Sequence, residues 1–514
     1  MPSAKTTFRA GVALFAAAVG IGLAAVPASA GPAAVPAVPD GPALARQLVK
    51  KVDVANTNRH LIALQRIADR NGRTRAASTD GFDQSADYVA GKLEAAGFTV
   101  SRQEFPYVDD VTSGASLTVG GTAAPVFRMR YSESLPAGGV TSTLSVVPND
   151  ATPGCEASDY ATAAGKVALV SRGGCSFVTK SLAAAAAGVL AILVYNNIPF
   201  VPLIGTLVEP IPGSIPVGGL SQVQGQQLLT QDGAPVTLDL QGFLDDRTSY
   251  NLIAETRTGK HNNVVMAGAH LDSVPDGPGI NANGTGSAAL LEIALQLGSS
   301  PKVNNAVRFA WWSAEPLGQI GAKYYVQDLD FEQQLDIALY MNFDMIGSLN
   351  AGYFTFDGDD SDFAGAGPGP YGSGQIEKAF ADYFDSTGVP LERNDLEPTF
   401  EYSAFVSNGI PSGGLYTGAE KVKTQEQADK WGGVAGQTFD PCFQMICDSL
   451  GNVDRVVLDR NSDAIAFVVG SYATSTEDIN GVPARAKRAK TRTAAARTAD
   501  GSVAKAAYTA AVTG

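Results

Sequence analysis

The chain has 514 residues, of which 45% are hydrophobic and 17% charged, so it is long enough for two domains that each bury a full core. Its 37 Lys and Arg residues are outnumbered by 51 Asp and Glu residues, and the formal net charge of −14 favours solubility. Because the basic residues are not gathered on the globular part, nucleic acid is not expected as a partner.

The first 30 residues have the three parts of a secretory signal peptide. Lys5 and Arg9 give a positive start, residues 11–26 are apolar, and residues 28–30 read Ala-Ser-Ala, a typical cleavage site. A retained membrane anchor is the weaker alternative, because the apolar run is short and rich in Ala and Gly, and no later segment could span a bilayer. We expect a mature chain that starts near residue 31, is secreted, and has no membrane contact after cleavage.

Residues 31–109 are predicted to supply the N-terminal helices and the first strand of the main domain. After a Pro- and Ala-rich leader, the segment shows three helical patterns and one alternating pattern, over residues 43–54, 58–71, 82–97 and 98–107. His60 lies on the second helical pattern and is expected at the surface rather than in a metal site.

Residues 110–248 have a different character, with short β-rich runs, many Gly and Pro residues and few charges. The centre, residues 165–197, reads as strand, turn, Ala-rich helix and strand, which predicts a small α/β unit without a catalytic cluster. The motifs RGGCSF and VYNN and the Ala-rich helix resemble the protease-associated domain. That resemblance implies an insert beside a peptidase active site that gates the access of substrate.

The four cysteines form two local pairs in the sequence. An even count in an exported chain indicates disulfides, although sequence alone leaves three connectivities open. Proximity favours Cys155 with Cys175 and Cys442 with Cys447. Neither pair has a CxxC spacing or a neighbouring His, which argues against a structural zinc site.

Residues 249–475 return to a regular βα rhythm. Apolar runs suited to central strands alternate with helical patterns; the strands are 251–255, 263–269, 307–313, 337–343 and 413–417, and the helices are 284–297, 318–327, 375–384 and 458–473. This order predicts an α/β fold with a mixed, mainly parallel sheet between helices. The Ala-, Arg- and Lys-rich residues 476–514 are predicted to be a disordered tail rather than an arm for nucleic acid.

Polar residues follow three of these strands directly. His270 and Asp272 follow the strand 263–269, and Glu315 and Asp344 follow the next two strands. Open α/β sheets bind ligands beyond the carboxyl ends of their strands. One His and three carboxylates at such an edge predict a metallohydrolase crevice.

Residues 250–475 also resemble the secreted bacterial double-zinc aminopeptidases of the leucine aminopeptidase type, relatives of glutamate carboxypeptidase. The shared motifs are GAHLDSV, the NGTG loop, RFAWW-x-AE, MNFDMIGS, GGLYTGA, and KWGG continuing to CDSL. The resemblance implies two zinc ions that share a bridging Asp. By motif, His270 and Asp344 would bind the first ion, Glu315 would be the general base, and Asp272 would orient His270.

Three ligand positions of that family are altered in this chain. The bridging Asp falls on Ala282, a metal-binding Glu falls on Pro316, and a late His falls on Gln444. The Tyr that stabilises the transition state in relatives falls on Phe443, and a Ser-Asp-His stretch corresponds to residues 400–402, which read Phe-Glu-Tyr.

These changes predict that the dinuclear site is lost. A methyl group and a proline ring cannot ligate, and without a bridging carboxylate two dications about 3.5–4 Å apart repel strongly. Asn283, Asp276 or Glu315 could move to supply a further ligand, but a ligating Glu315 is no longer free as a base. We therefore expect no bound zinc, or at most one weakly bound ion.

The favoured interpretation is a pseudo-peptidase that binds peptides, protein N-termini or a partner protein without hydrolysing them. The alternative is an active or weakly active metallo-aminopeptidase that removes apolar N-terminal residues at an unusual metal site. A serine hydrolase is disfavoured, because Ser273 and Ser287 lack the Gly-x-Ser-x-Gly turn.

Overall fold

The computed structural model describes residues 42–199, 202–363, 365, 367–480, 488–490 and 492. The predicted signal peptide and the leader lie outside the described residues. Within the described part of the chain, no helix is long and apolar enough to cross a membrane.

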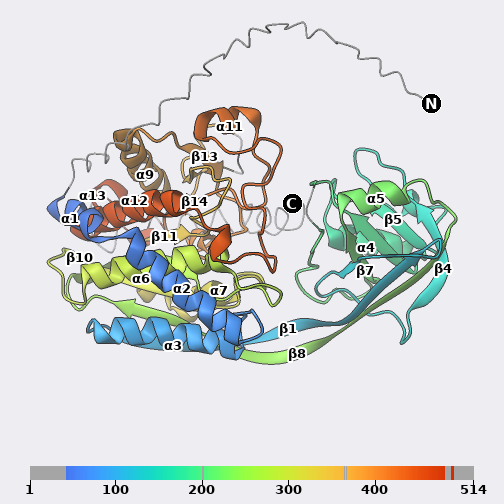
Figure 1. Ribbon diagram of the computed structural model, residues 1–514, viewed down its shortest axis with the longest axis horizontal. Coiled ribbons are helices and arrows are strands. Elements are labelled where there is room, and N and C mark those ends of the chain that lie inside the picture. Colours follow the sequence, from blue (N-terminus) through green and yellow to red (C-terminus); the bar gives the residue numbers. More distant parts are fainter. Residues whose placement is uncertain are drawn as a thin grey trace, which may run out of the picture. The chain divides into compact units, whose positions relative to one another are not determined.

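The strands form one mixed sheet with a parallel centre (Figure 1). β9 (Lys260–His270) lies between β10 (Asn305–Trp312) and β11 (Ile337–Phe343) and runs parallel to both. β14 (Ser412–Tyr416) extends the parallel set beside β11, whereas β8 (Pro235–Glu255) is antiparallel to β10. The sheet ends with two short strands, β12 (Phe354–Asp357) and β13 (Glu392–Asp395). The predicted α/β class with a mixed, mainly parallel sheet is confirmed.

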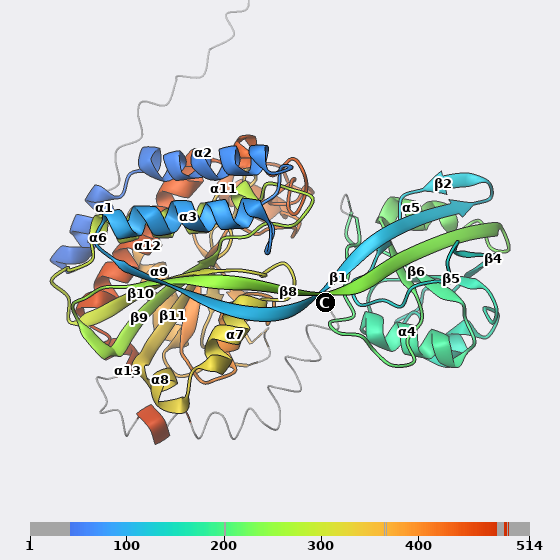
Figure 2. The same ribbon diagram turned by 90° about the horizontal axis from the view of Figure 1, so that it is seen from below.

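Helices cover both faces of this sheet, because alternate side chains of each strand point to opposite faces. On β9, Val265 and Ala267 pack into one core, whereas Met266 packs into the other. Figure 2 shows α2 and α3 on one side of the sheet and α7 and α8 on the other. The helices of the first core are α1 (Ala43–Lys51), α2 (Val54–Arg70), α3 (Asp80–Ala95), α6 (Gly286–Leu297), α9 (Ser373–Thr387) and α12 (Arg455–Thr474). The helices on the opposite face are α7 (Ile320–Asp328), α8 (Phe331–Asp336) and α10 (Tyr402–Val406).

The three N-terminal helices begin and end within four residues of the predicted bounds. Asp53 and Thr79 cap α2 and α3 by accepting hydrogen bonds from backbone N–H groups of the first turn. The expectation for His60 was wrong. The residue is 6% exposed, and Nδ1 lies 2.7 Å from the Tyr88 hydroxyl, because α2 turns this side chain toward α3.

Two long strands lead from the central sheet into the insert. β1 (Thr99–Val119) pairs with β8 along almost its whole length, well past the strand end predicted at residue 107. Both predicted limits of the insert, residues 110 and 248, therefore fall inside continuous strands. Pro106 is tolerated because β1 pairs with β8 on one side only over this stretch, so its missing N–H breaks no second ladder.

The insert is a small α/β unit, as its sequence predicts. β5 (Val167–Ser171), α4 (Phe177–Ala186) and β6 (Ala191–Tyr195) are the predicted strand, helix and strand. β5 and β6 are parallel and wholly buried between two small apolar cores. The remaining elements are β2 (Thr122–Ala124), β3 (Phe127–Arg128), β4 (Val140–Val146), β7 (Val217–Leu220) and α5 (Gln222–Leu228).

Both predicted disulfides are present, Cys155–Cys175 in the insert and Cys442–Cys447 in the main domain. The C-terminal region differs from the predicted disorder where it is described. α13 (Glu477–Asn480) is helical, and Arg488 and Arg492 are buried. Their guanidinium groups donate to the backbone carbonyls of Gln334 and Leu335 at the end of α8 and of Ile337 at the start of β11. The other residues after 480 lie outside the described part.

Candidate functional site

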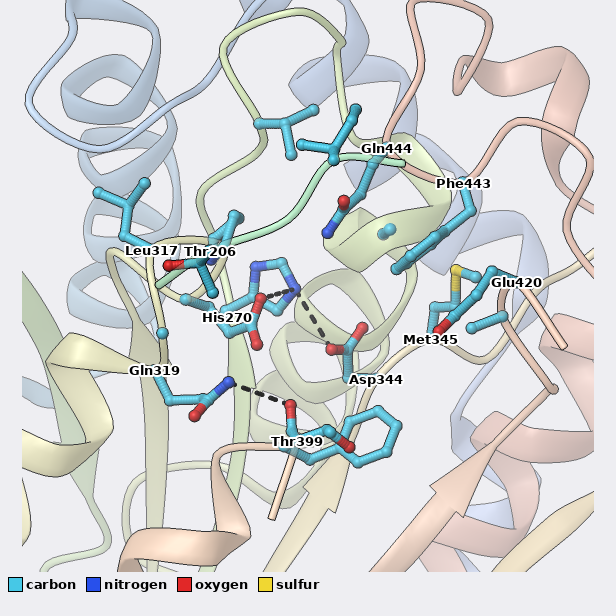
Figure 3. Close-up of a pocket in the computed structure, with 18 of the residues that line it drawn as sticks. Thr206, His270, Leu317, Gln319, Asp344, Met345, Thr399, Glu420, Phe443 and Gln444 are labelled. Atoms are coloured by element: carbon cyan, nitrogen blue, oxygen red, sulfur yellow. Dashed lines mark hydrogen bonds and ion pairs between the residues drawn. The ribbon is translucent and has the colours of Figure 1, made fainter. Parts of the chain in front are cut away.

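The parallel centre of the sheet brings the predicted polar residues together. His270 is the last residue of β9, Glu315 follows β10, and Asp344 follows β11 directly. Because these three strands are neighbours and point the same way, their side chains meet at one edge. They line a pocket of about 660 Å³ (Figure 3).

His270 is the centre of this group and is 3% exposed. Its Nδ1 lies 3.0 Å from the backbone carbonyl oxygen of Asp272 and 3.4 Å from the Asp272 carboxylate. Since a carbonyl can only accept, Nδ1 carries the proton and Nε2 faces the pocket. Nε2 lies 3.4 Å from an oxygen of Asp344 and 3.6 Å from an oxygen of Glu315.

The electrostatics of the site are those of crowded, buried carboxylates. Burial acts to lower the pKa of His270, but Asp344 and Glu315 outweigh it, so the pKa lies well above its ordinary value. Burial, opposed in part by His270, holds the pKa of Glu315 well above its ordinary value. The surroundings therefore favour the cationic form of His270 and the neutral form of Glu315.

Glu401 is a fourth carboxylate that the sequence analysis did not place in the site. It is fully buried, and one oxygen accepts a hydrogen bond of 2.8 Å from the amide of Asn342. The other oxygen has no partner among the described residues. Burial and the nearby Asp344 raise the pKa of Glu401 to about 7. The only signal in the sequence was its place in the altered Phe-Glu-Tyr stretch.

The three altered positions also line the pocket, where none of the ligand groups that the resemblance implies is present. Ala282 forms a small apolar cluster with Met345 and Ala419, against which Phe443 packs. Pro316 and Gln444 line the same pocket, and Figure 3 shows the Gln444 amide pointing toward His270.

The groups that could have replaced a lost ligand differ in their availability. The Asn283 amide is already engaged, since it donates to the carbonyl of Phe343 at 2.7 Å and accepts from the N–H of Gly286 at 3.0 Å. Asp276 is exposed and is not part of the pocket wall. Glu315 alone of the three faces His270.

Neither serine considered for a hydrolase is free to act as a nucleophile. The Ser273 hydroxyl donates to the carbonyl of Val274 and accepts from the backbone N–H of Arg75. The Ser287 hydroxyl donates to the backbone carbonyl of His270 at 2.6 Å, and Ser287 is not among the residues that line the pocket.

Two buried charges brace the loops that shape the pocket, and sequence reasoning found neither. Arg75, from the segment before α3, donates to the carbonyls of Leu271, Pro278 and Gly279. Asp448 accepts from the backbone N–H groups of Asn281 and Ala282, in η2 (Ile280–Thr285), at 2.8 and 3.0 Å. Both contacts join segments more than 160 residues apart, so no local pattern announces them.

Residues of the insert complete the pocket wall. Its lining includes Arg130, Arg172, and five residues between 202 and 208: Pro202, Leu203, Ile204, Thr206 and Val208. Ten described non-glycine residues have positive φ, and five of them line the pocket: Tyr131, Val208, Gln319, Ala419 and Gln444. Such conformations are costly and concentrate at ligand sites, and half of those in the described residues fall on this pocket.

Comparison with known proteins decides the family. The profile of Peptidase family M28 matches residues 251–469, and that of the PA domain matches residues 140–228. Over 461 residues the chain is 43% identical to a probable lipoprotein aminopeptidase, LpqL, of Mycobacterium tuberculosis, covering 88% of this chain and 92% of that protein. The chain belongs to peptidase family M28. It has the aminopeptidase fold of that family, with an inserted PA domain.

Further M28 relatives agree with this assignment. An aminopeptidase of Pseudomonas aeruginosa is 40% identical over 462 residues, covering 87% of this chain and 86% of the relative. Among solved structures, BSAP, a zinc aminopeptidase of Bacillus subtilis, has a TM-score of 0.65 and 25% identity, covering 83% of this chain and 96% of that one. An aminopeptidase of Aneurinibacillus sp. strain AM-1 shares the fold, with a TM-score of 0.66, 23% identity, and coverage of 84% and 96%.

The donor set of this M28 chain does not fit a pair of zinc ions. A catalytic zinc is held by three protein ligands and keeps one open position. The pocket offers one imidazole nitrogen and the carboxylates of Glu315 and Asp344, with ligand atoms that all lie within 4.8 Å of one another. That is a donor set for one ion, and Ala282, which lines the same pocket, offers no ligand group.

Proposed function

We propose that this M28 protein is an exported pseudo-peptidase that binds peptides, protein N-termini or a partner protein and does not hydrolyse them. The observation that carries the proposal is the replacement of three ligand positions on the pocket wall by Ala282, Pro316 and Gln444. A bridging carboxylate supplies the negative charge that lets two dications lie about 3.5–4 Å apart, and Ala282 supplies none.

The pocket that remains suits the amino terminus of a peptide. Its floor carries Glu315 and Asp344 beside the single imidazole of His270, and Glu397 and Glu420 also line the pocket, an arrangement that favours a cationic partner. An α-ammonium group there would donate hydrogen bonds to carboxylate oxygens, which are among the strongest that proteins make. The apolar cluster at Ala282 would lie beside an apolar first side chain.

Export outside the cytoplasm is part of the proposal. It is supported by the N-terminal sequence pattern and by the two disulfides, since such bonds persist in oxidising compartments. We propose no nucleic-acid partner and no membrane contact after signal cleavage.

The test is a pair of measurements on the purified mature chain. Calorimetric titration with a leucyl peptide should show binding that falls at least about tenfold when the amino terminus is acetylated, because acetylation removes the cation. Leucyl anilide should show no turnover. The exposed Asp276→Asn variant is the control for a general change of charge and should bind as the wild type does.

The competing function is a metallo-aminopeptidase with an unusual metal site. It is favoured by one observation, the position of Glu315 3.6 Å from His270 Nε2, where a general base could act. Anilide turnover that is abolished both by a chelator and by Glu315→Gln would establish this function and refute the pseudo-peptidase.

A further inference from the structure

We propose that the pocket binds a single divalent cation, with His270, Asp344 and Glu315 as its three protein ligands. Glu315 is then a metal ligand and not a free general base. The inference rests on the proposed function, since it starts from the loss of the paired site, and it explains why the remaining site would not hydrolyse a peptide.

The distances within the cluster are those of ligands around one metal. His270 Nε2 lies 3.4 Å from Asp344 and 3.6 Å from Glu315, which is longer than the usual range of hydrogen bonds. Two ligands at about 2.05 Å from a tetrahedral zinc ion are separated by about 3.3 Å. The three side chains are thus spaced as if around a common centre, with room for an ion between them.

The imidazole of His270 is prepared for this role. Nδ1 is held by the backbone carbonyl of Asp272 at 3.0 Å, and the ring is almost completely buried. This contact fixes the tautomer and turns the lone pair of Nε2 toward the two carboxylates, which is the usual way in which proteins orient a metal-binding His.

The altered positions also indicate that one ion of the pair is kept. By the motif comparison, His270 and Asp344 belong to the first ion of the family, and both are retained. Pro316 and Gln444 occupy the positions of the second ion's ligands, and Ala282 that of the bridge. Every retained ligand therefore belongs to one ion, which is the pattern expected if one ion was kept and the other lost.

Charge also limits the site to one ion. The carboxylates of Asp344 and Glu315 together neutralise one dication. Among the described residues no further carboxylate belongs to the group whose ligand atoms are all within 4.8 Å of one another, so a second dication would lack a close anionic ligand. Since Pro316 supplies no carboxylate, Glu315 is the group that completes a set of three ligands.

The experiment measures metal content and affinity rather than activity. The purified chain is stripped with a chelator and titrated with Zn²⁺, and the cobalt-loaded protein is followed by its visible absorption. The wild type should bind one ion. Glu315→Gln should weaken binding by about 100-fold or more, since even partners of ligands are worth 10–100-fold. Glu315→Asp keeps a carboxylate and should keep the ion with a shifted cobalt band, and Asp276→Asn should match the wild type.

The possible results separate this inference from the proposed function. One ion in the wild type that is lost in a folded Glu315→Gln variant supports the inference. An ion retained by Glu315→Gln overturns it, because a base that is not a ligand leaves metal content unchanged. No ion in the wild type overturns it and leaves the pseudo-peptidase standing. Two ions per chain overturn both proposals.

Discussion

Restoring the three altered ligands should rebuild a site for two zinc ions. The variant carries Ala282→Asp, Pro316→Glu and Gln444→His. Each substitution is compatible with its surroundings, because all three residues line a pocket of about 660 Å³ and Gln444 has φ near 55°, a conformation that His tolerates better than most residues. Phe443 can be changed to Tyr in a second step if turnover is sought.

The bridging carboxylate decides the outcome. Two dications 3.5 Å apart repel by about 19 kcal/mol at an effective dielectric constant of about 20. One carboxylate about 2.1 Å from each ion attracts the pair by about 32 kcal/mol on the same scale. Without Ala282→Asp no single carboxylate attracts both ions at close range, so Gln444→His and Pro316→Glu alone should not raise the zinc content to two.

Elemental analysis of dialysed protein is the assay, with leucyl anilide turnover as a second readout. We expect no more than one zinc in the wild type and two in the triple variant. Turnover should appear only in the triple variant and should be lost again when Glu315→Gln is added. A folded triple variant that still binds one ion or none would refute the assignment of the altered positions.

Three further predictions concern the elements that hold the pocket in shape. Arg75→Met should lower the free energy of unfolding by about 3 kcal/mol or more, because three buried carbonyls lose their donor at about 1–3 kcal/mol each. Chemical denaturation measures this loss. A loss below about 1 kcal/mol would contradict the prediction. Burial and Asp440 raise the pKa of Asp448 to about 7. Between about pH 4 and 7 the folded state therefore holds a proton that the unfolded state has released. The free energy of unfolding should fall as the pH rises through this range. That slope should be smaller in Asp448→Asn, and an unchanged slope would exclude Asp448 as its source. Replacing the Cys442–Cys447 disulfide by serines should lower the free energy of unfolding by about 2 kcal/mol, and replacing Cys155–Cys175 should lower it by about 3 kcal/mol. The second loss is larger because that disulfide closes the longer loop. Equal or reversed losses would show that loop entropy does not dominate.

The sequence was sufficient to predict those site residues that directly follow a regular strand pattern. His270, Glu315 and Asp344 follow apolar runs that could only be central strands, and parallel strands bring their carboxyl ends to one edge. The two disulfides follow from proximity in the chain. The insert was found from composition, but its limits were not, because β1 and β8 continue across them.

The residues that the sequence did not reveal act across long distances in the chain. Arg75 reaches carbonyls about 200 residues away, and Asp448 reaches backbone N–H groups more than 160 residues away. Glu401 enters the site from the stretch before α10 and is joined to Asn342 of β11. No periodicity or motif encodes such contacts, since each depends on how separate loops meet once the sheet has formed.

These long-range contacts also explain how the pocket can persist without a pair of ions. A site whose loops are held only by metal collapses when the metal is lost, because binding energy and folding energy are then the same. Here the loop after His270 is held by Arg75, and the segment at Ala282 is held by Asp448, and both contacts are made to backbone groups rather than to ligand side chains. On the proposed function, loss of the bridging carboxylate therefore removes an ion but not the scaffold around it. The geometry that would position a peptide terminus is then separable from the chemistry that would cleave it, and the proposed binding protein requires changes at the ligand positions alone.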